Sequence, residues 1–270
     1  MEWSKALYGD GFETFLNSGA LRLRFQAIVY LPEGHLFGYE SLSHGASGSL
    51  YESAELLFQH ARDLDLIFDL ESRCQSILLK NLRRTPDHYI FLNLEPVLLE
   101  SDNFLNLPVF HSSNNIDRGV FVVELTERHH IKNLEMIKKN IKALRNMGFK
   151  IALDDVGSGY SDLDSIVEFL PDFIKISNKI IQDISTNAVK RKIVSLLQEL
   201  AEVSSSFLVA EGIENYQDYR ILRDMGVHFG QGYLLALPKP EMNYMNRIHQ
   251  FTEVQATGTD HLHAVYTNME

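Results

Sequence analysis

The sequence predicts an α/β protein, a (β/α)8 TIM-like barrel with one antiparallel strand near its N-terminus. Three observations support this class: eight short segments have the composition of strands, helical patterns separate most of them, and only five residues separate the first two. The length agrees, because such barrels use about 200–250 residues as one domain and the chain has 270.

The eight expected strands are mostly apolar along their whole length, and several are rich in Val, Ile and Phe. Strands that are covered on both faces have this character. We expect them at Arg24–Tyr30, Leu36–Leu42, Tyr89–Leu94, Val120–Leu125, Lys150–Val156, Phe173–Ile176, Phe207–Ile213 and His228–Ala236.

The first two strands depart from the alternation of strand and helix. The segment Leu31–His35 lies between them and contains Pro32 and Gly34. It is too short for a parallel crossover, which needs about a dozen residues, but it suits a hairpin. One strand of the barrel is therefore expected to run antiparallel.

Helices are expected where apolar residues recur at intervals of three or four. Ile131–Met147 has the clearest such stripe, and Leu66–Leu78 and Val189–Leu200 repeat the pattern. Gly148 and Gly226 each follow a helical segment, at the position where glycine commonly ends a helix.

The barrel is expected to occupy residues 17–249 as one domain. Residues 1–16 would form an N-terminal lead-in, and residues 250–270, which lack clear periodicity, a C-terminal tail or linker.

The composition limits the classes of function. The hydrophobic fraction is 45%, which argues against disorder. No apolar run approaches the roughly 20 residues of a membrane span, and the first residues lack the order of a signal peptide. The single cysteine excludes a zinc site built on paired cysteines. We therefore expect a cytoplasmic protein without a membrane partner.

The formal net charge is −11. A net acidic protein is a poor generic binder of nucleic acid, so we expect no DNA partner. An anionic substrate would need a local positive charge, which bound metal ions supply.

Polar side chains interrupt the apolar strands near their carboxyl ends, where barrels of this kind place their chemistry. Each of these residues, taken alone, is equally consistent with an ordinary strand-end residue that reaches water or caps the next helix. Together, they indicate a site on one rim. They are Glu40, Asn93, Glu124, Asp154, Asp155, Lys175, Glu211 and Gln231.

Five clustered carboxylates repel one another unless they are protonated or bound to cations. Carboxylates and a carboxamide without Cys or His favour Mg²⁺ or Mn²⁺ over Zn²⁺. Five carboxylates exceed the needs of one octahedral ion, so two ions are expected. Paired ions typically serve phosphate-ester hydrolysis.

These residues fall in motifs that resemble the EAL-domain family, bacterial phosphodiesterases of cyclic di-GMP, from about Asn17 to Pro240. The family's Glu-Ala-Leu signature reads Glu-Ser-Leu here, its Asn-x-Ser-Pro reads Asn-Leu-Glu-Pro, and Glu-Leu-Thr-Glu is intact. The other matching motifs follow in the same order. The matches are Glu40–Leu42, Asn93–Pro96, Glu124–Glu127, Asp154–Ser161, Pro171–Ile176, Val209–Glu214 and Gly230–Tyr233.

The resemblance implies a role for each site residue. One metal would be held by Glu40, Asn93, Glu124 and Asp154, and the second by Asp154, Asp155 and Glu211. The catalytic set would be Lys175, which orients and helps to activate the attacking water, Glu127, which supports the glycine loop, and Gln231, which positions the water or the second metal's surroundings. The substrate would contact Gln26, Glu40, Leu42 and His44.

Three departures from the family pattern bear on this reading. Ser41 replaces Ala, Val156 replaces Phe in the rim loop, and His44 stands where the family has an Arg that contacts a substrate phosphate. A neutral His donates one hydrogen bond, whereas Arg donates a charged fork. Substrate affinity is therefore affected more than metal binding.

The leading hypothesis is a cyclic-di-GMP-specific phosphodiesterase that uses Mg²⁺ or Mn²⁺, is inhibited by Ca²⁺, and opens cyclic di-GMP to linear pGpG. The alternative is a degenerate EAL domain that binds cyclic di-GMP or a protein partner without hydrolysis. We also expect a homodimer and a regulatory domain, either fused or separate.

Overall fold

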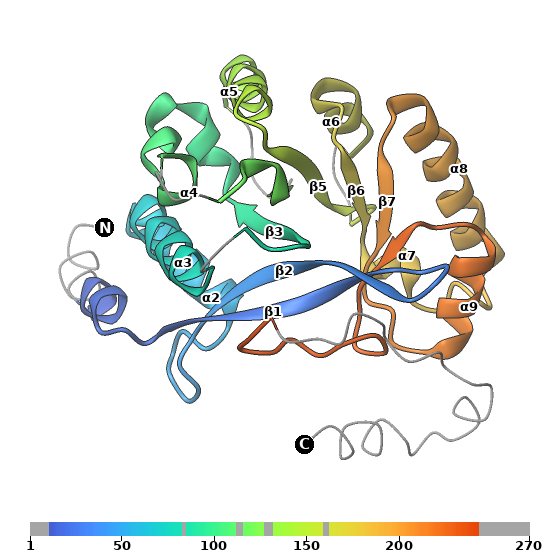
Figure 1. Ribbon diagram of the computed structural model, residues 1–270, viewed down its shortest axis with the longest axis horizontal. Helices are drawn as coiled ribbons and strands as arrows, with labels where there is room; N and C mark the ends of the chain where they lie inside the picture. Colours follow the sequence, from blue (N-terminus) through green and yellow to red (C-terminus); the bar gives the residue numbers. More distant parts are fainter. Residues whose placement is uncertain (1–10, 83–84, 112–115, 127–131, 159–161, 243–270) are drawn as a thin grey trace.

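The computed structural model describes residues 11–82, 85–111, 116–126, 132–158 and 162–242, in which eight strands close into a barrel (Figure 1). Neighbouring strands follow the order of the chain, and the last strand pairs with the first. The predicted fold class is confirmed. The strands are β1 (Leu21–Tyr30), β2 (His35–Gly45), β3 (Tyr89–Leu94), β4 (Phe121–Thr126), β5 (Lys150–Val156), β6 (Phe173–Ile176), β7 (Phe207–Ala210) and β8 (Phe229–Gly230).

Strand β1 runs antiparallel to both of its neighbours, β2 and β8, whereas the other neighbouring pairs are parallel. The connection from β1 to β2 is a tight turn in which the Gly34 N–H donates to the Tyr30 carbonyl at 2.9 Å. Gly34 has a φ of +69°, which glycine adopts without steric cost. The predicted hairpin is confirmed.

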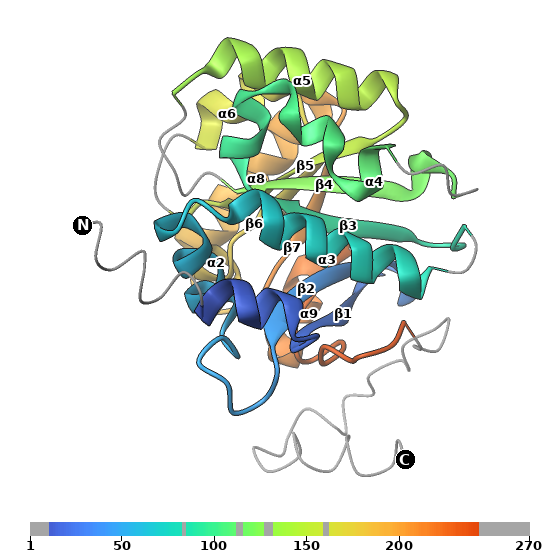
Figure 2. The ribbon, with the colours of Figure 1, turned by 90° about the vertical axis from the view of Figure 1, so that its left-hand side faces the viewer.

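The helices lie outside the ring of strands (Figures 1 and 2). None in the described part of the chain is long and apolar enough to cross a membrane. Residues 11–17 are helical. The labelled α-helices are α2 (Ala54–Asp63), α3 (Ile67–Asn81), α4 (Pro108–His111), α5 (Leu134–Asn146), α6 (Asp162–Phe169), α7 (Asn178–Ile181), α8 (Ala188–Ser204) and α9 (Tyr216–Asp224), and the 3-10 segments are η1 (Pro96–Glu100), η2 (Asp102–Asn106) and η3 (Arg118–Val120).

The three helices predicted from apolar stripes correspond to α3, α5 and α8. Helix α5 begins at Leu134 because the Asn133 side chain caps it by accepting the Met136 N–H at 3.1 Å. Asn is among the preferred residues at this position. The predicted start, Ile131, lies outside the described residues.

The last two strands are shorter than the sequence predicted. Strand β7 ends at Ala210 rather than Ile213, and β8 covers Phe229–Gly230 rather than His228–Ala236. The prediction was wrong here because both apolar runs continue past the point where the chain leaves the sheet.

Two glycines explain where these strands end. Gly212 has a φ of +66°, a left-handed conformation that breaks the extended chain. A Cβ at Gly232 would lie 2.2 Å from the backbone of Ile213, so only glycine fits this close approach. Glu211 and Gln231 therefore lie just beyond the ends of their strands.

An apolar layer fills the inside of the barrel. Seven strands contribute one buried residue each, and Phe37 of β2 packs against them, with its ring centroid 3.9 Å from that of Phe229. A larger apolar core lies between the strands and the surrounding helices. The inner layer consists of Ile28, Phe91, Val122, Ala152, Phe173, Val209 and Phe229.

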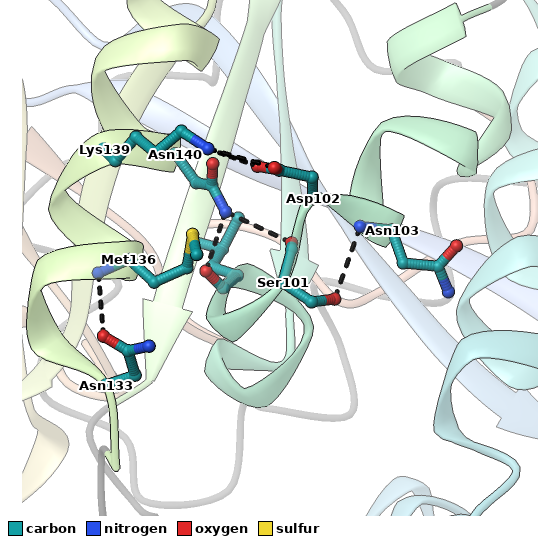
Figure 3. A network of polar contacts seen from close by, with 8 residues as sticks. Ser101, Asp102, Asn103, Asn133, Met136, Lys139 and Asn140 are labelled. Atoms are coloured by element: carbon teal, nitrogen blue, oxygen red, sulfur yellow. Dashed lines mark hydrogen bonds and ion pairs between the residues drawn. The ribbon is translucent and has the colours of Figure 1, made fainter.

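A polar network ties α5 to the 3-10 segments that follow β3 (Figure 3). Asn140, which is 1% exposed, donates from Nδ2 to the carbonyls of Leu99 at 3.0 Å and Ser101 at 3.1 Å. Beside it, Lys139 pairs with Asp102 at 3.0 Å in an exposed position. The network holds the segment that leaves the strand on which Asn93 lies.

We expect Asn140→Ala to lower the free energy of unfolding by about 1–3 kcal/mol, because it removes the Asn140 donor from one buried and one partly buried carbonyl. The control Lys139→Ala should cost less than about 1 kcal/mol, since its ion pair is exposed. Urea unfolding measures both values, and equal losses would contradict the assignment.

Candidate functional site

The polar residues of the site form a second layer above the apolar layer inside the barrel. On β3 to β6, Asn93, Glu124, Asp154 and Lys175 each lie two residues after a member of the apolar layer. Side chains two positions apart on a strand share a face, so these residues also point inward. Glu211 and Gln231 keep the same spacing just beyond β7 and β8.

Lys175 lies at the centre of this polar layer and is 1% exposed. Its Nζ is 2.8 Å from Glu124 Oε1, 2.8 Å from Glu211 Oε1, 2.9 Å from Asp154 Oδ1 and 3.3 Å from Glu40 Oε2. Four strands or strand ends thus aim their carboxylates at one ammonium, as the sequence predicted for a common rim.

The charges of this cluster shift the protonation of its members. Burial alone would lower the pKa of Lys175, but the neighbouring carboxylates outweigh it and raise the pKa well above its usual value. Burial, followed by the charge of Glu40, raises the pKa of Glu124. Burial also raises the pKa of Glu211 to about 8, against the opposing charge of Lys175. The site is therefore short of positive charge.

Amide side chains hold Glu40 in place. Gln231 donates from Nε2 to Glu40 Oε2 at 2.7 Å and to Gln26 Oε1 at 2.8 Å, and Gln26 donates to the Ala236 carbonyl at 3.0 Å. Asn93 donates to the other carboxylate oxygen of Glu40 at 3.2 Å. The two oxygens of Glu40 are thus oriented by a residue of β3 and by a residue just beyond β8.

Asp155 follows Asp154 in a left-handed backbone conformation, with a φ of +59°. The pairing of β5 with β6 shifts register between Leu153 and Val156, so both acids lie in an irregularity of the strand. Such irregularities re-aim side chains and are frequent next to active sites. Asp155 itself is half-buried.

The remaining predicted site residues are not among the contacts of Lys175. Leu42 is half-buried and lines a cavity beside the cluster. His44 lies four residues after Glu40 on β2, and its Nδ1 is 2.7 Å from the Gly45 carbonyl. Glu127 lies outside the described residues, as does the end of the glycine loop from Gly159 to Ser161.

The donor set fits hard divalent cations. Four carboxylates surround one ammonium, which leaves a formal charge of −3 when all five groups are ionised. Two buried oxygens, Glu124 Oε2 and Gln231 Oε1, accept no hydrogen bond from the described residues. Also within that part of the chain, no three His, Cys, Asp or Glu side chains form a ready metal cage. The chemistry of the residues matches Mg²⁺ or Mn²⁺, while Lys175 occupies the centre.

A cavity of about 320 Å³ adjoins the cluster, and its lining includes charged residues that the sequence did not predict as site residues. Arg62 of α2 pairs with Glu95 at 2.7 Å, and Glu71 of α3 accepts the Glu95 N–H at 3.3 Å. Glu71 follows Leu70 on the apolar stripe of its helix and is 2% exposed. An acidic residue next to an apolar helical stripe is the sequence signal that could have identified Glu71.

A closed barrel with this polar layer belongs to the (β/α)8 class, and comparison identifies the family. A family model for the EAL domain matches residues 11–238. The chain belongs to the EAL domain family, as its motifs predicted.

Two curated relatives are cyclic di-GMP phosphodiesterases. The probable enzyme PdeA of Escherichia coli is 33% identical over 150 residues, covering 55% of this chain and 21% of PdeA. RocR of Pseudomonas aeruginosa is 28% identical over 237 residues, covering 86% of this chain and 60% of RocR. The chain thus spans less than two thirds of either relative.

A solved structure agrees with the fold. The calcium and cy-diGMP complex of Klebsiella pneumoniae BlrP1 is 26% identical to this chain, with a TM-score of 0.69. The match covers 83% of this chain and 57% of BlrP1.

We expect Glu71→Gln to change the pH dependence of stability. Burial, and then the charge of Glu95, raises the pKa of Glu71 from 4.5 to about 8 in the folded protein. A carboxyl with a raised pKa stabilises the fold at low pH and loses this contribution as pH rises through the folded value. The amide of Gln stays neutral throughout.

The melting temperature of the Glu71→Gln variant minus that of the wild type should therefore increase as the pH is raised from about 6 to about 9. Paired thermal melts across this range measure it. A difference that stays constant with pH would show that Glu71 does not titrate there.

Proposed function

We propose that this chain is a divalent-metal-dependent phosphodiesterase that hydrolyses cyclic di-GMP to linear pGpG. The observation that carries the proposal is the convergence of Glu40, Glu124, Asp154 and Glu211 on Lys175. Family membership and the phosphodiesterase relatives support the same reaction.

The proposed ligands follow the two sets implied by the motifs. Glu40, Asn93, Glu124 and Asp154 would hold one ion, and Asp154, Asp155 and Glu211 the other. Bound divalent ions would supply Lewis acidity and the positive charge that an anionic phosphate ester requires.

The chain's own residues would orient the reactants. The ammonium of Lys175 lies among carboxylates that favour its charged form, so it is a hydrogen-bond donor. It would therefore orient the attacking oxygen rather than accept its proton. Gln231 would keep Glu40 in its ligating orientation through the 2.7 Å hydrogen bond, and Glu127 would support the glycine loop.

A degenerate EAL domain that binds cyclic di-GMP or a protein partner without hydrolysis is the second candidate. His44, in place of the family Arg, favours it, since a charged contact to phosphate is missing there. The retained carboxylates and Lys175 favour the enzyme. A homodimer, a regulatory domain and a cytoplasmic location are further proposals for the same protein.

We expect Glu40→Ala and Asp154→Ala each to reduce hydrolysis of cyclic di-GMP by more than about 100-fold, because loss of a mere supporting partner already costs 10–100-fold. Both variants should remain folded, because residues at the carboxyl-end rim of such a barrel serve function more than stability. Product separation after incubation with Mg²⁺ or Mn²⁺ measures activity. The matched control is Glu199→Ala, an exposed acid on α8, and undiminished turnover in either site variant would remove the metal assignment.

We expect Ca²⁺ to support binding of cyclic di-GMP but to inhibit its hydrolysis. Ca²⁺ accepts longer bonds and looser geometry than Mg²⁺, so the reacting groups are held less well. The BlrP1 complex, which contains calcium and cy-diGMP, supports the binding part. Equal rates of pGpG formation with Ca²⁺ and Mg²⁺ would contradict this expectation.

A further inference from the structure

Strand β1 continues past the polar layer toward the open rim of the barrel. Along one face of this strand, Ile28 belongs to the apolar layer and Gln26 accepts a hydrogen bond from Gln231 in the polar layer. Residues two positions apart on a strand share a face, so Arg24 is the next side chain on it. Because β1 is antiparallel to β2, its first residues lie at the rim where the carboxylates gather. Arg24 therefore stands just outside the carboxylate cluster.

The exposure of the side chains along β1 agrees with this placement. Leu21, Leu23 and Phe25 point to the opposite face and are buried in the core between the strands and the helices. Arg22 and Arg24, which alternate with them, are exposed. The face that carries the two arginines is therefore open to ligands at the rim.

The two arginines differ in what they contact. Arg22 donates from Nη1 to the carbonyls of Gly19 and Leu21, to the second at 3.0 Å. Within the described part of the chain, the side chain of Arg24 forms no hydrogen bond or ion pair. A guanidinium donates through several N–H groups in a planar fork that matches a phosphate. Arg24 therefore keeps this fork for a ligand.

Two proposed substrate contacts on β2 are neighbours of Arg24. Leu42 is its direct partner in the antiparallel pair, and His44 follows on the same face. The Cβ atoms of direct partners lie about 4.5–5.5 Å apart and those of diagonal neighbours about 7–8 Å, which long side chains still bridge. His44 has one ring nitrogen, Nδ1, 2.7 Å from the Gly45 carbonyl. A group that contacts Leu42 or His44 thus lies within reach of the Arg24 guanidinium.

An acidic residue nearby reports the positive charge at this part of the rim. The pKa of Glu52 is lowered, first by hydrogen bonds from the Gly48 N–H and the Ser47 hydroxyl and then by the charges of Arg24 and His44. Both hydrogen bonds are 2.8 Å long. Glu52 is thus bound within its own loop, and among the described residues it forms no ion pair with Arg24.

A cyclic dinucleotide carries two phosphodiesters on opposite sides of one ring. Only the phosphodiester that is cleaved would lie at the proposed metal ions, so the other needs a partner of its own. The carboxylates of the cluster would repel this second phosphate. A cation on the same face, just outside the cluster, suits it, and Arg24 has both the charge and the position.

We propose that Arg24 binds the phosphate of the cyclic dinucleotide that is not cleaved. Its guanidinium donates charge-assisted hydrogen bonds to the phosphate oxygens. The inference rests on the proposed function, since the second phosphate is located by placing the first at the carboxylate cluster.

The test measures binding of cyclic di-GMP by calorimetry with Ca²⁺ present. We expect Arg24→Gln to weaken binding by about tenfold, because a charge-assisted contact to the phosphate is lost. The matched control is Arg22→Gln, the same change two residues away on the same face. It should weaken binding by less than about twofold, because its guanidinium bonds to backbone carbonyls and its field is screened by salt.

Two further measurements separate a phosphate contact from a structural role of the side chain. Arg24→Lys keeps the charge but not the planar fork, so its loss of affinity should be smaller than that of Arg24→Gln. Added KCl should weaken binding more in the wild type than in Arg24→Gln, since salt screens the contact that the variant lacks. Thermal melts of each variant report whether it is folded.

Several results would overturn the inference while leaving the proposed function in place. They are unchanged affinity in Arg24→Gln, equal weakening by Arg22→Gln, equal losses in Arg24→Lys and Arg24→Gln, or an equal effect of KCl on wild type and Arg24→Gln. A wild-type protein that binds cyclic di-GMP without hydrolysing it would overturn the proposed function alone. A wild-type protein that binds no cyclic di-GMP would overturn both.

Discussion

The ammonium of Lys175, buried among four carboxylates, is the interaction on which the site depends. Glu40, Glu124, Asp154 and Glu211 come from different strands, and without a central cation their charges would repel one another in a medium of low polarity. One ammonium offsets only part of that charge. The rim therefore carries an excess of acidic groups, which agrees with the divalent cations proposed for it.

The closed barrel supports this layer of buried charged groups. An apolar layer that includes Phe91, Phe173 and Phe229 fills the interior, and the polar layer lies on it with the two-residue spacing of the strands. The antiparallel start brings Gln26 of β1 beside Gln231, which in turn orients Glu40. The reversal of one strand thus contributes directly to the geometry of a proposed metal ligand.

The carboxylate cluster and the cavity beside it come from different parts of the fold. The carboxylates lie at strand ends, whose positions are held by the sheet. The side cavity is lined by α2 and by the residues that follow β3, with Arg62 and Glu95 at their contact. A change in α2 can therefore alter the cavity without moving the carboxylates, because the two are held by different elements.

The sequence by itself determined the barrel class, the hairpin start and the rim residues, because strand periodicity and short-range spacing are local properties. It overextended β7 and β8, since the apolar composition continues beyond the points where these strands end. A left-handed backbone at Gly212 and a close backbone approach at Gly232 turn the chain out of the sheet. Only the tertiary structure placed Lys175 at the centre of four carboxylates and brought Arg62 to Glu95, 33 residues away along the chain. Such contacts depend on how distant elements pack, and no spacing within one element encodes them.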